Sequence, residues 1–193
     1  MKIRKIQSKE INEKKKNRNK WIVGIVLIGI MLFGTIGYSF MSNDNTINQE
    51  DKIDYNGYEF IKNNNLWYLQ INENVFAFKY NPNQVEKIPG YIKILNGYYN
   101  QPLYIFSENV EAELEIYRNM NNYVLRVQKA CLEGEKCPDD ILPVKTCEDN
   151  IIIIREDEIS SIRQENNCVF IEGKKEELGK ISDEFLFKIL GIN

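Results

Sequence analysis

The sequence contains no histidine. Ser-His and Cys-His nucleophilic catalysis, histidine-ligated zinc hydrolases and histidine proton relays are therefore excluded. A Walker loop and a dinucleotide-binding glycine fingerprint are also missing, and residues 54–57 resemble only the middle of a calcium loop, without its final acid. Because no signature of an active site remains, we predict that the protein is not an enzyme, has no catalytic, cofactor-binding or metal-binding residues, and uses no cofactor.

Charge is absent from residues 21–40, which read WIVGIVLIGIMLFGTIGYSF. As a helix this run is about 30 Å long, enough to cross the hydrocarbon core of a bilayer. Residues 1–20 carry nine Lys and Arg against two acids. The positive-inside rule predicts a cytoplasmic tail at 1–20, a transmembrane helix at 21–40 in contact with the lipid bilayer, and the rest of the chain outside the cytoplasm. The alternative is a cleaved signal near residues 37–39, but the run exceeds the usual apolar core of about 7–15 residues.

Beyond residue 20 the chain has 16 basic and 26 acidic residues, a net charge of −10. An acidic surface disfavours nucleic acid and permits a basic protein or a cationic surface as partner. The polar residues 41–52 predict a flexible linker. Residues 53–193 are long enough for one compact extracytoplasmic domain and too short for two.

Short aromatic and β-branched segments at 58–62, 66–71 and 75–80, separated by asparagine-rich turns, predict a three-stranded antiparallel meander. Segments at 151–155, 160–164 and 168–172 predict a second meander, and 175–190 predicts a closing helix.

The longest predicted helix covers residues 109–131, with Asn109 as its N-cap. Its apolar residues step by three and four and predict one buried face, made of Val110, Leu114, Tyr117, Met120, Val124, Val127 and Cys131. Asn119 and Arg126 would lie beside this face, where a buried Arg126 would need a carboxylate or carbonyl partner. The predicted fold class is therefore α+β: a single N-terminal transmembrane helix, then antiparallel β-meanders packed with two helices and stapled by disulfides.

The four cysteines all lie in the part predicted to be outside the cytoplasm, at Cys131, Cys137, Cys147 and Cys168. Their spacing lacks the paired C-x2-C knuckles of zinc sites, whereas an even number in an oxidising compartment predicts two disulfides. Three pairings are possible, of which we favour Cys131–Cys137 and Cys147–Cys168.

Two further groups of residues are weaker candidates for binding. The tyrosines at 91, 98, 99 and 104 could form an aromatic platform for sugars, although tyrosines covering a sheet edge are commoner. The acidic groups at 133–140 and 156–158 could bind calcium weakly, although hydrated surface acids are the commoner explanation.

Several segments carry a resemblance to known sequences: Asn119, then RVQKAC at 126–131, PVKTC at 143–147, NCVFIEG at 167–173, DEFL at 183–186 and GI at 191–192. Together they resemble a group of uncharacterised small single-pass membrane proteins of archaea with a cysteine-containing extracytoplasmic domain. The resemblance covers most of the outer domain and implies an archaeal membrane protein that faces outward. It transfers no catalytic residue.

These observations favour a membrane-anchored module that binds another protein or a cell-surface component. One alternative is a minor pilin-like subunit, but residues 19–21 (NKW) lack the Gly or Ala junction that such subunits need. The other is a carboxylate-dependent enzyme, which would require a cleft where two carboxylates converge.

Overall fold

The computed structural model describes residues 51–137 and 139–192, which all fall in one compact unit. The predicted tail at 1–20, the predicted transmembrane helix at 21–40 and nearly all of the predicted linker lie outside the described residues. Within the two described ranges, no helix has the length and hydropathy needed to cross a membrane.

The first sheet is an antiparallel meander of four strands in the order β1-β2-β3-β4. Its strands are β1 (Lys52–Tyr55), β2 (Tyr58–Asn63), β3 (Leu66–Ile71) and β4 (Asn74–Phe78). Asparagines at positive φ make the turns, among them Asn64 at +48° and Asn72 at +53°. Asparagine tolerates this left-handed conformation better than most residues do. The predicted three-stranded meander is confirmed, and β1 adds a strand that was not predicted.

The second sheet is mixed and has the order β10-β11-β9-β5-β6. Its strands are β5 (Pro102–Ser107), β6 (Arg126–Lys129), β9 (Ile151–Glu156), β10 (Ser161–Glu165) and β11 (Cys168–Gly173). Only β10 and β11 pair antiparallel, while the other three pairs are parallel. The predicted second meander is therefore wrong, because β11 inserts between β9 and β10. Residues 151–154 and all of β11 are buried, which requires central positions in the sheet.

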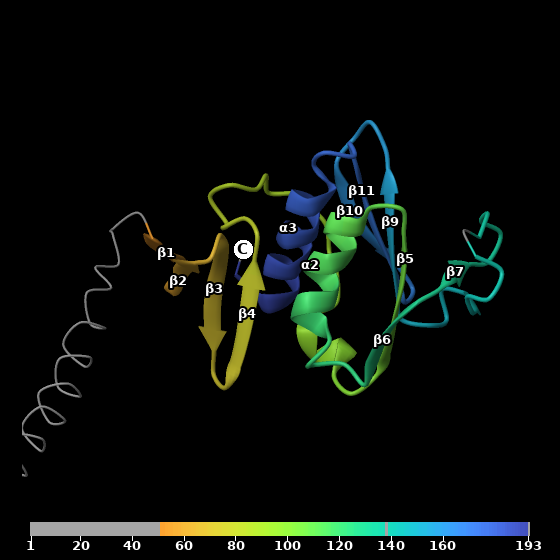
Figure 1. Cartoon of the computed structure of the whole chain (residues 1–193), viewed down its shortest axis with the longest axis horizontal. Helices are drawn as coiled ribbons and strands as arrows, with labels where there is room; N and C mark the ends of the chain where they lie inside the picture. Colours follow the sequence, from red (N-terminus) through yellow and green to blue (C-terminus); the bar gives the residue numbers. More distant parts are fainter. Residues whose placement is uncertain (1–50, 138, 193) are drawn as a thin grey trace, which may run out of the picture. The chain divides into compact units, whose positions relative to one another are not determined.

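Two minor elements complete the strands and turns. The short parallel pair β7 (Cys131–Leu132) and β8 (Val144–Lys145) lies beyond the five-stranded sheet, away from the helices (Figure 1). A 3-10 helix, η2 (Leu95–Tyr98), precedes β5.

Helix α2 (Val110–Met120) begins as predicted, since the Asn109 side chain accepts a 2.9 Å hydrogen bond from the backbone N–H of Ala112. It ends eleven residues before Cys131, so the predicted length is wrong. Residues 126–129 pair with β5 instead of continuing the helix. The apolar spacing of three and four continues past Met120, but pairing with a neighbouring strand outweighs this local preference.

Helix α3 (Leu178–Leu190) ends at Gly191, whose φ of +73° makes it the predicted C-terminal stop. Both helices lie between the two sheets, giving three layers (Figure 1). The rings of Phe60, Phe78 and Phe187 meet in the core between the four-stranded sheet and α3, with centroids 4.7–6.0 Å apart. The α+β class and the packing of two helices on antiparallel sheet are confirmed for this domain.

The four cysteines form the two favoured disulfides, Cys131–Cys137 and Cys147–Cys168, with Cα atoms 5.5 and 4.8 Å apart. These separations are ordinary for disulfides. No cysteine in the described residues is free. Disulfides are typical of oxidising surroundings outside the cytoplasm.

Candidate functional site

Helix α2 turns three large apolar side chains outward. Val110, Leu114 and Tyr117, which we call the α2 strip, are 67%, 52% and 47% exposed. The prediction that these residues face the core is wrong. The buried side of the helix consists instead of Ala112, Glu115, Ile116, Asn119 and Met120. The α2 strip is thus an apolar face, spaced i, i+4 and i+7, that nothing in the described domain covers.

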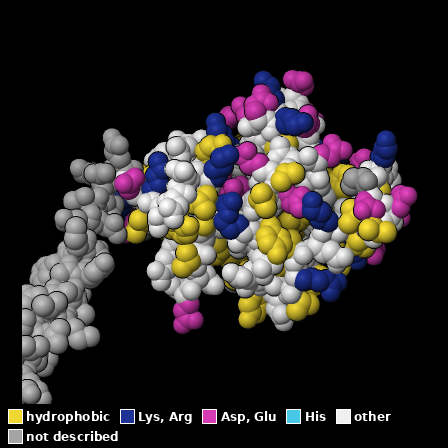
Figure 2. All heavy atoms as spheres, in the orientation of Figure 1, with side chains coloured by type: hydrophobic (Ala, Val, Ile, Leu, Met, Phe, Trp, Pro, Cys, Tyr) yellow, Lys and Arg dark blue, Asp and Glu magenta, His cyan; other side chains and the backbone are white. Residues whose placement is uncertain are grey.

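Ion pairs surround the α2 strip. Lys79 contacts Glu111 at 2.6 Å, and Lys129 contacts Glu113 at 2.9 Å. Arg118 contacts the buried Glu115 at 2.7 Å. Figure 2 shows hydrophobic side chains gathered over α2 with charged groups beside them.

These three pairs sum to zero charge, whereas the described residues contain 16 basic and 24 acidic residues, a net charge of −8. An apolar centre with a polar rim is the usual anatomy of a protein interface.

Buried polar side chains of the helices bind the free edge of β4 and the two residues Lys79 and Tyr80 that follow it. Asn119 accepts a 2.8 Å hydrogen bond from the backbone N–H of Ala77 and donates one of 2.9 Å to the Ala77 carbonyl. Glu115 accepts a 3.3 Å bond from the backbone N–H of Lys79. Asp183 accepts a 2.8 Å bond from the backbone N–H of Tyr80. These contacts satisfy an otherwise unpaired strand edge and fix the orientation of α2.

Asn119 thus lies on the buried side of α2 and binds the backbone of Ala77. Arg126 does not lie beside it, because this residue is on β6 and is exposed. The Arg126 guanidinium donates a 2.9 Å hydrogen bond to the Tyr104 hydroxyl, and the Lys145 ammonium lies 4.1 Å from the centre of the Tyr104 ring. Hydrogen bonding to Arg126, then to Lys145, lowers the pKa of Tyr104. Asp149, 3.1 Å from Lys145, balances part of this positive charge.

Two carboxylates do converge, but inside the core. Glu115 and Asp183 are 2% and 0% exposed. Burial, and next the charge of Glu115, raise the pKa of Asp183 well above its usual range. Both groups are sealed from solvent and hydrogen-bond to the backbone just beyond β4, which is the arrangement of a structural network.

The acidic groups and tyrosines singled out in the sequence are dispersed. Lys175 contacts Glu156 at 3.3 Å, so one acidic turn is partly neutralised. Nowhere in residues 51–137 and 139–192 are three His, Cys, Asp or Glu side chains placed to hold a metal ion. Tyr98 and Tyr104 are buried, whereas Tyr91 and Tyr99 are 99% and 66% exposed, so the four do not form one platform.

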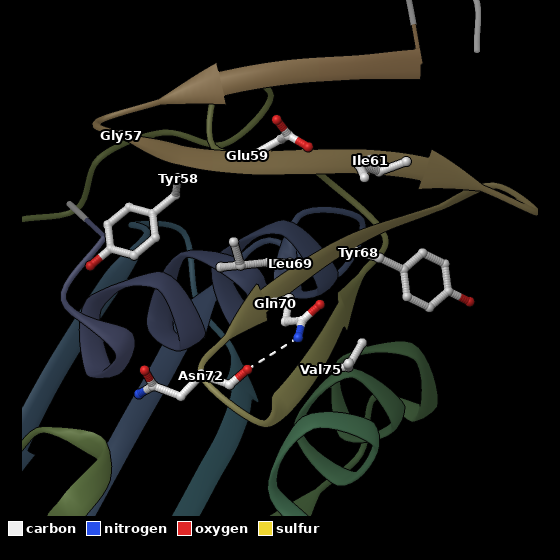
Figure 3. A pocket seen from close by; sticks show the side chains of 9 residues that line it. All are labelled: Gly57, Tyr58, Glu59, Ile61, Tyr68, Leu69, Gln70, Asn72 and Val75. Carbon is white, nitrogen blue, oxygen red and sulfur yellow. Dashed lines mark hydrogen bonds between the residues drawn. The ribbon is translucent and has the colours of Figure 1, made fainter. Parts of the chain in front are cut away.

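A hollow of about 580 Å³ lies on the four-stranded sheet (Figure 3). Its exposed apolar side chains come from two strands, Ile61 on β2 and Val75 on β4, at 37% and 62% exposure. Glu59 is the only charged residue that lines it, and it is paired with Lys52 at 2.6 Å. Tyr58, Tyr68, Gln70 and Asn72 also line the hollow, which therefore offers hydroxyls and amides but no cluster of charged groups.

Comparison with protein-family models, with curated proteins and with solved structures finds no match to this chain.

Proposed function

We propose that the protein is a membrane-anchored interaction module whose folded domain lies outside the cytoplasm and binds another protein through the α2 strip. In this proposal residues 21–40 form the anchor and the basic residues at 1–20 remain in the cytoplasm. The two disulfides support the extracytoplasmic placement.

The observation that carries the proposal is the exposure of Val110, Leu114 and Tyr117 on one face of α2. Single exposed apolar residues are ordinary, but three in successive turns of one helix form a continuous strip. The helix is held rigidly, because on its other side Asn119 binds Ala77 of β4 and Glu115 binds Lys79 just beyond that strand. A rigid, locally neutral apolar strip suits the groove or helix face of a partner.

Site-specific photo-crosslinking in intact cells tests this proposal. A photoreactive residue at Leu114 in the full chain should give a discrete covalent adduct with a protein. The matched control is the same residue at Ile159, which is 75% exposed and lies between β9 and β10. Tyr117→Asp placed in the Leu114 probe should abolish the adduct, because a charge in the strip would have to be desolvated.

Comparing the adducts formed at Leu114 and at Ile159 distinguishes specific binding from nonspecific labelling. An adduct at Leu114 that is missing at Ile159 and lost in Tyr117→Asp supports the proposal. Equal labelling at both positions, or none at Leu114, would show that the strip has no bound partner. Since Tyr117 is exposed, its substitution should change the free energy of unfolding by no more than about 0.5 kcal/mol.

A further inference from the structure

A separate cleft lies where the β3–β4 turn approaches η2 and the C-terminal end of α3. Its volume is about 350 Å³. Phe76 and Ile189 form part of its lining and are 4% and 2% exposed, so the cleft has an apolar floor that belongs to the core. None of the residues of the α2 strip lines it.

The lining of this cleft has no charged side chain. This is unusual for a chain in which Lys, Arg, Asp and Glu make up 27% of the residues. An ionic ligand would find no counter-ion there. The polar groups of the lining are instead asparagine amides and one phenol: Asn72, Asn74, Asn96 and Tyr123.

Most of these amides are available to a ligand. The side chains of Asn72 and Asn74 make no hydrogen bond within the described residues, and both residues are exposed. Asn96 accepts a 2.8 Å hydrogen bond from the Tyr123 hydroxyl through its Oδ1, which leaves its amino group free to donate. An amide can donate and accept at once, so it can pair with a hydroxyl in either direction.

An aromatic pair flanks the same cleft. The ring of Tyr99 meets that of Tyr123 at 67°, with centroids 5.4 Å apart. Tyr99 is 66% exposed, so much of its ring remains in contact with solvent. Exposed aromatic rings beside amides offer an apolar surface together with hydrogen bonds.

We propose that this cleft binds a neutral saccharide. A sugar ring has an apolar surface of C–H groups, which fits the floor at Phe76 and Ile189, and a rim of hydroxyls, which fits the amides. The absence of charge disfavours uronic acids, phosphosugars and peptides with charged ends. The volume lies at the lower end of the range for small-ligand sites, in keeping with one or two sugar rings. This inference does not depend on the α2 strip.

The test is saturation-transfer NMR on the full chain in a detergent without a sugar headgroup. Glucose, galactose, mannose and N-acetylglucosamine serve as probes, with glucuronic acid as the charged probe. At least one neutral sugar should receive saturation at its ring protons, with Kd on the order of 1 mM. Glucuronic acid should bind at least about tenfold more weakly, because its carboxylate would meet no cation.

Three variants link the signal to the cleft. Asn74→Ala and Asn96→Ala each remove an amide and should weaken binding about tenfold. Asn72→Gly removes a third amide while keeping a residue that accepts the positive φ. The matched control is Asn64→Gly, since Asn64 also has positive φ (+48°) but lies in the β2–β3 turn, outside the cleft lining.

The proposal is overturned if no neutral sugar receives saturation, if glucuronic acid binds as well as the neutral sugars, or if Asn64→Gly weakens binding as much as Asn72→Gly. A loss confined to the three cleft variants supports it. Because Asn72, Asn74 and Asn96 are all exposed, these variants should fold, which their unfolding curves will show.

Discussion

The Asp183 carboxylate on α3 accepts a 2.8 Å hydrogen bond from the backbone N–H of Tyr80, just beyond the end of β4. This bond ties the four-stranded sheet to a helix that lies 103 residues later in the chain. Asp183 also interacts with the buried Glu115, and its second carboxylate oxygen, Oδ1, has no hydrogen-bond partner among the described residues. The residue that joins helix and sheet is therefore also one of two neighbouring buried acids.

We predict that the contribution of Asp183 to the stability of the domain falls as the pH rises above about 4, the ordinary pKa of an aspartate. Burial, and next Glu115, raise the pKa of Asp183 in the folded state. The folded state then binds more protons than the unfolded state between the two pKa values, and the free energy of unfolding decreases through that range. Each unit by which the pKa is raised corresponds to about 1.4 kcal/mol.

The variant Asp183→Asn should remove this part of the pH dependence. Its amide oxygen can still accept from Tyr80, and it carries no charge beside Glu115, so at neutral pH the variant should be more stable by at least about 1 kcal/mol. Urea unfolding between pH 4 and 8 measures the effect. The control is Asp157→Asn at an exposed position, whose free energy of unfolding should vary with pH as it does in the unmodified protein. If the free energy of unfolding of Asp183→Asn varies with pH in the same way, the prediction is wrong.

A second prediction concerns Asn119, which holds both backbone groups of Ala77. Asn119→Ala should lower the free energy of unfolding by about 1–3 kcal/mol, because the part-buried N–H of Ala77 loses its partner and its carbonyl keeps only the 3.3 Å hydrogen bond from Arg118. Asn122→Ala, at an exposed position after the same helix, should change it by no more than about 0.5 kcal/mol. Urea unfolding measures the free energy of unfolding of both variants. Similar losses in the two would show that the hydrogen bonds between Asn119 and Ala77 contribute little to stability.

Local structure was largely predictable where the chain forms hairpins. The boundaries of β3 were correct at both ends, and the Asn-rich turns were correctly placed, because alternation and turn residues act over a few positions. Asn109 and Gly191 likewise marked a helix start and a helix end through local capping.

The elements whose bounds or order depend on residues far away in the sequence could not be predicted from local patterns. Helix α2 ends early because residues 126–129 pair with β5, and β11 enters the sheet between β9 and β10. One signal was overlooked: the uninterrupted apolar run at 151–154 is typical of a central parallel strand and not of a meander with one exposed face.

The candidate surface was mispredicted for a physical reason. The larger apolar residues of α2 were placed inward, yet the core takes Ala112, Ile116 and Met120 together with the two polar residues that bind β4. Glu115 and Asn119 share this face at spacings of three and four, but only the β4 edge explains why polar groups belong there. The cleft beside η2 was missed because its residues come from four separate parts of the chain.

A third prediction concerns Gly90, which covers the edge of β10. Its φ is +147°, and an added Cβ would lie 2.5 Å from the backbone oxygen of Ile162. Gly90→Ala should therefore lower the free energy of unfolding by about 2 kcal/mol or more, because relieving the overlap requires the backbone at residue 90 or at Ile162 to move.

Gly97→Ala is the matched control for this glycine. Its added Cβ would meet only the flexible side chain of Lys93, at 3.2 Å, and its φ is not in the left-handed region. The free energy of unfolding should change by no more than about 0.5 kcal/mol. Urea unfolding measures both variants, and equal effects would show that the approach of Gly90 to β10 is not tight.

The last prediction separates the two disulfides. Cys147–Cys168 spans 21 residues and joins the segment before β9 to the first residue of β11, whereas Cys131–Cys137 spans 6. In the chain-entropy model, replacing both cysteines of a pair with alanine should cost about 3 kcal/mol for the longer loop and about 2 kcal/mol for the shorter. Cys168 is fully buried, so its loss also leaves a gap in the packing around Ile151 and Phe170. The double variant at 147 and 168 should therefore unfold at a clearly lower urea concentration than the double variant at 131 and 137. The reverse order would mean that the shorter loop stabilises the domain more than the longer loop does.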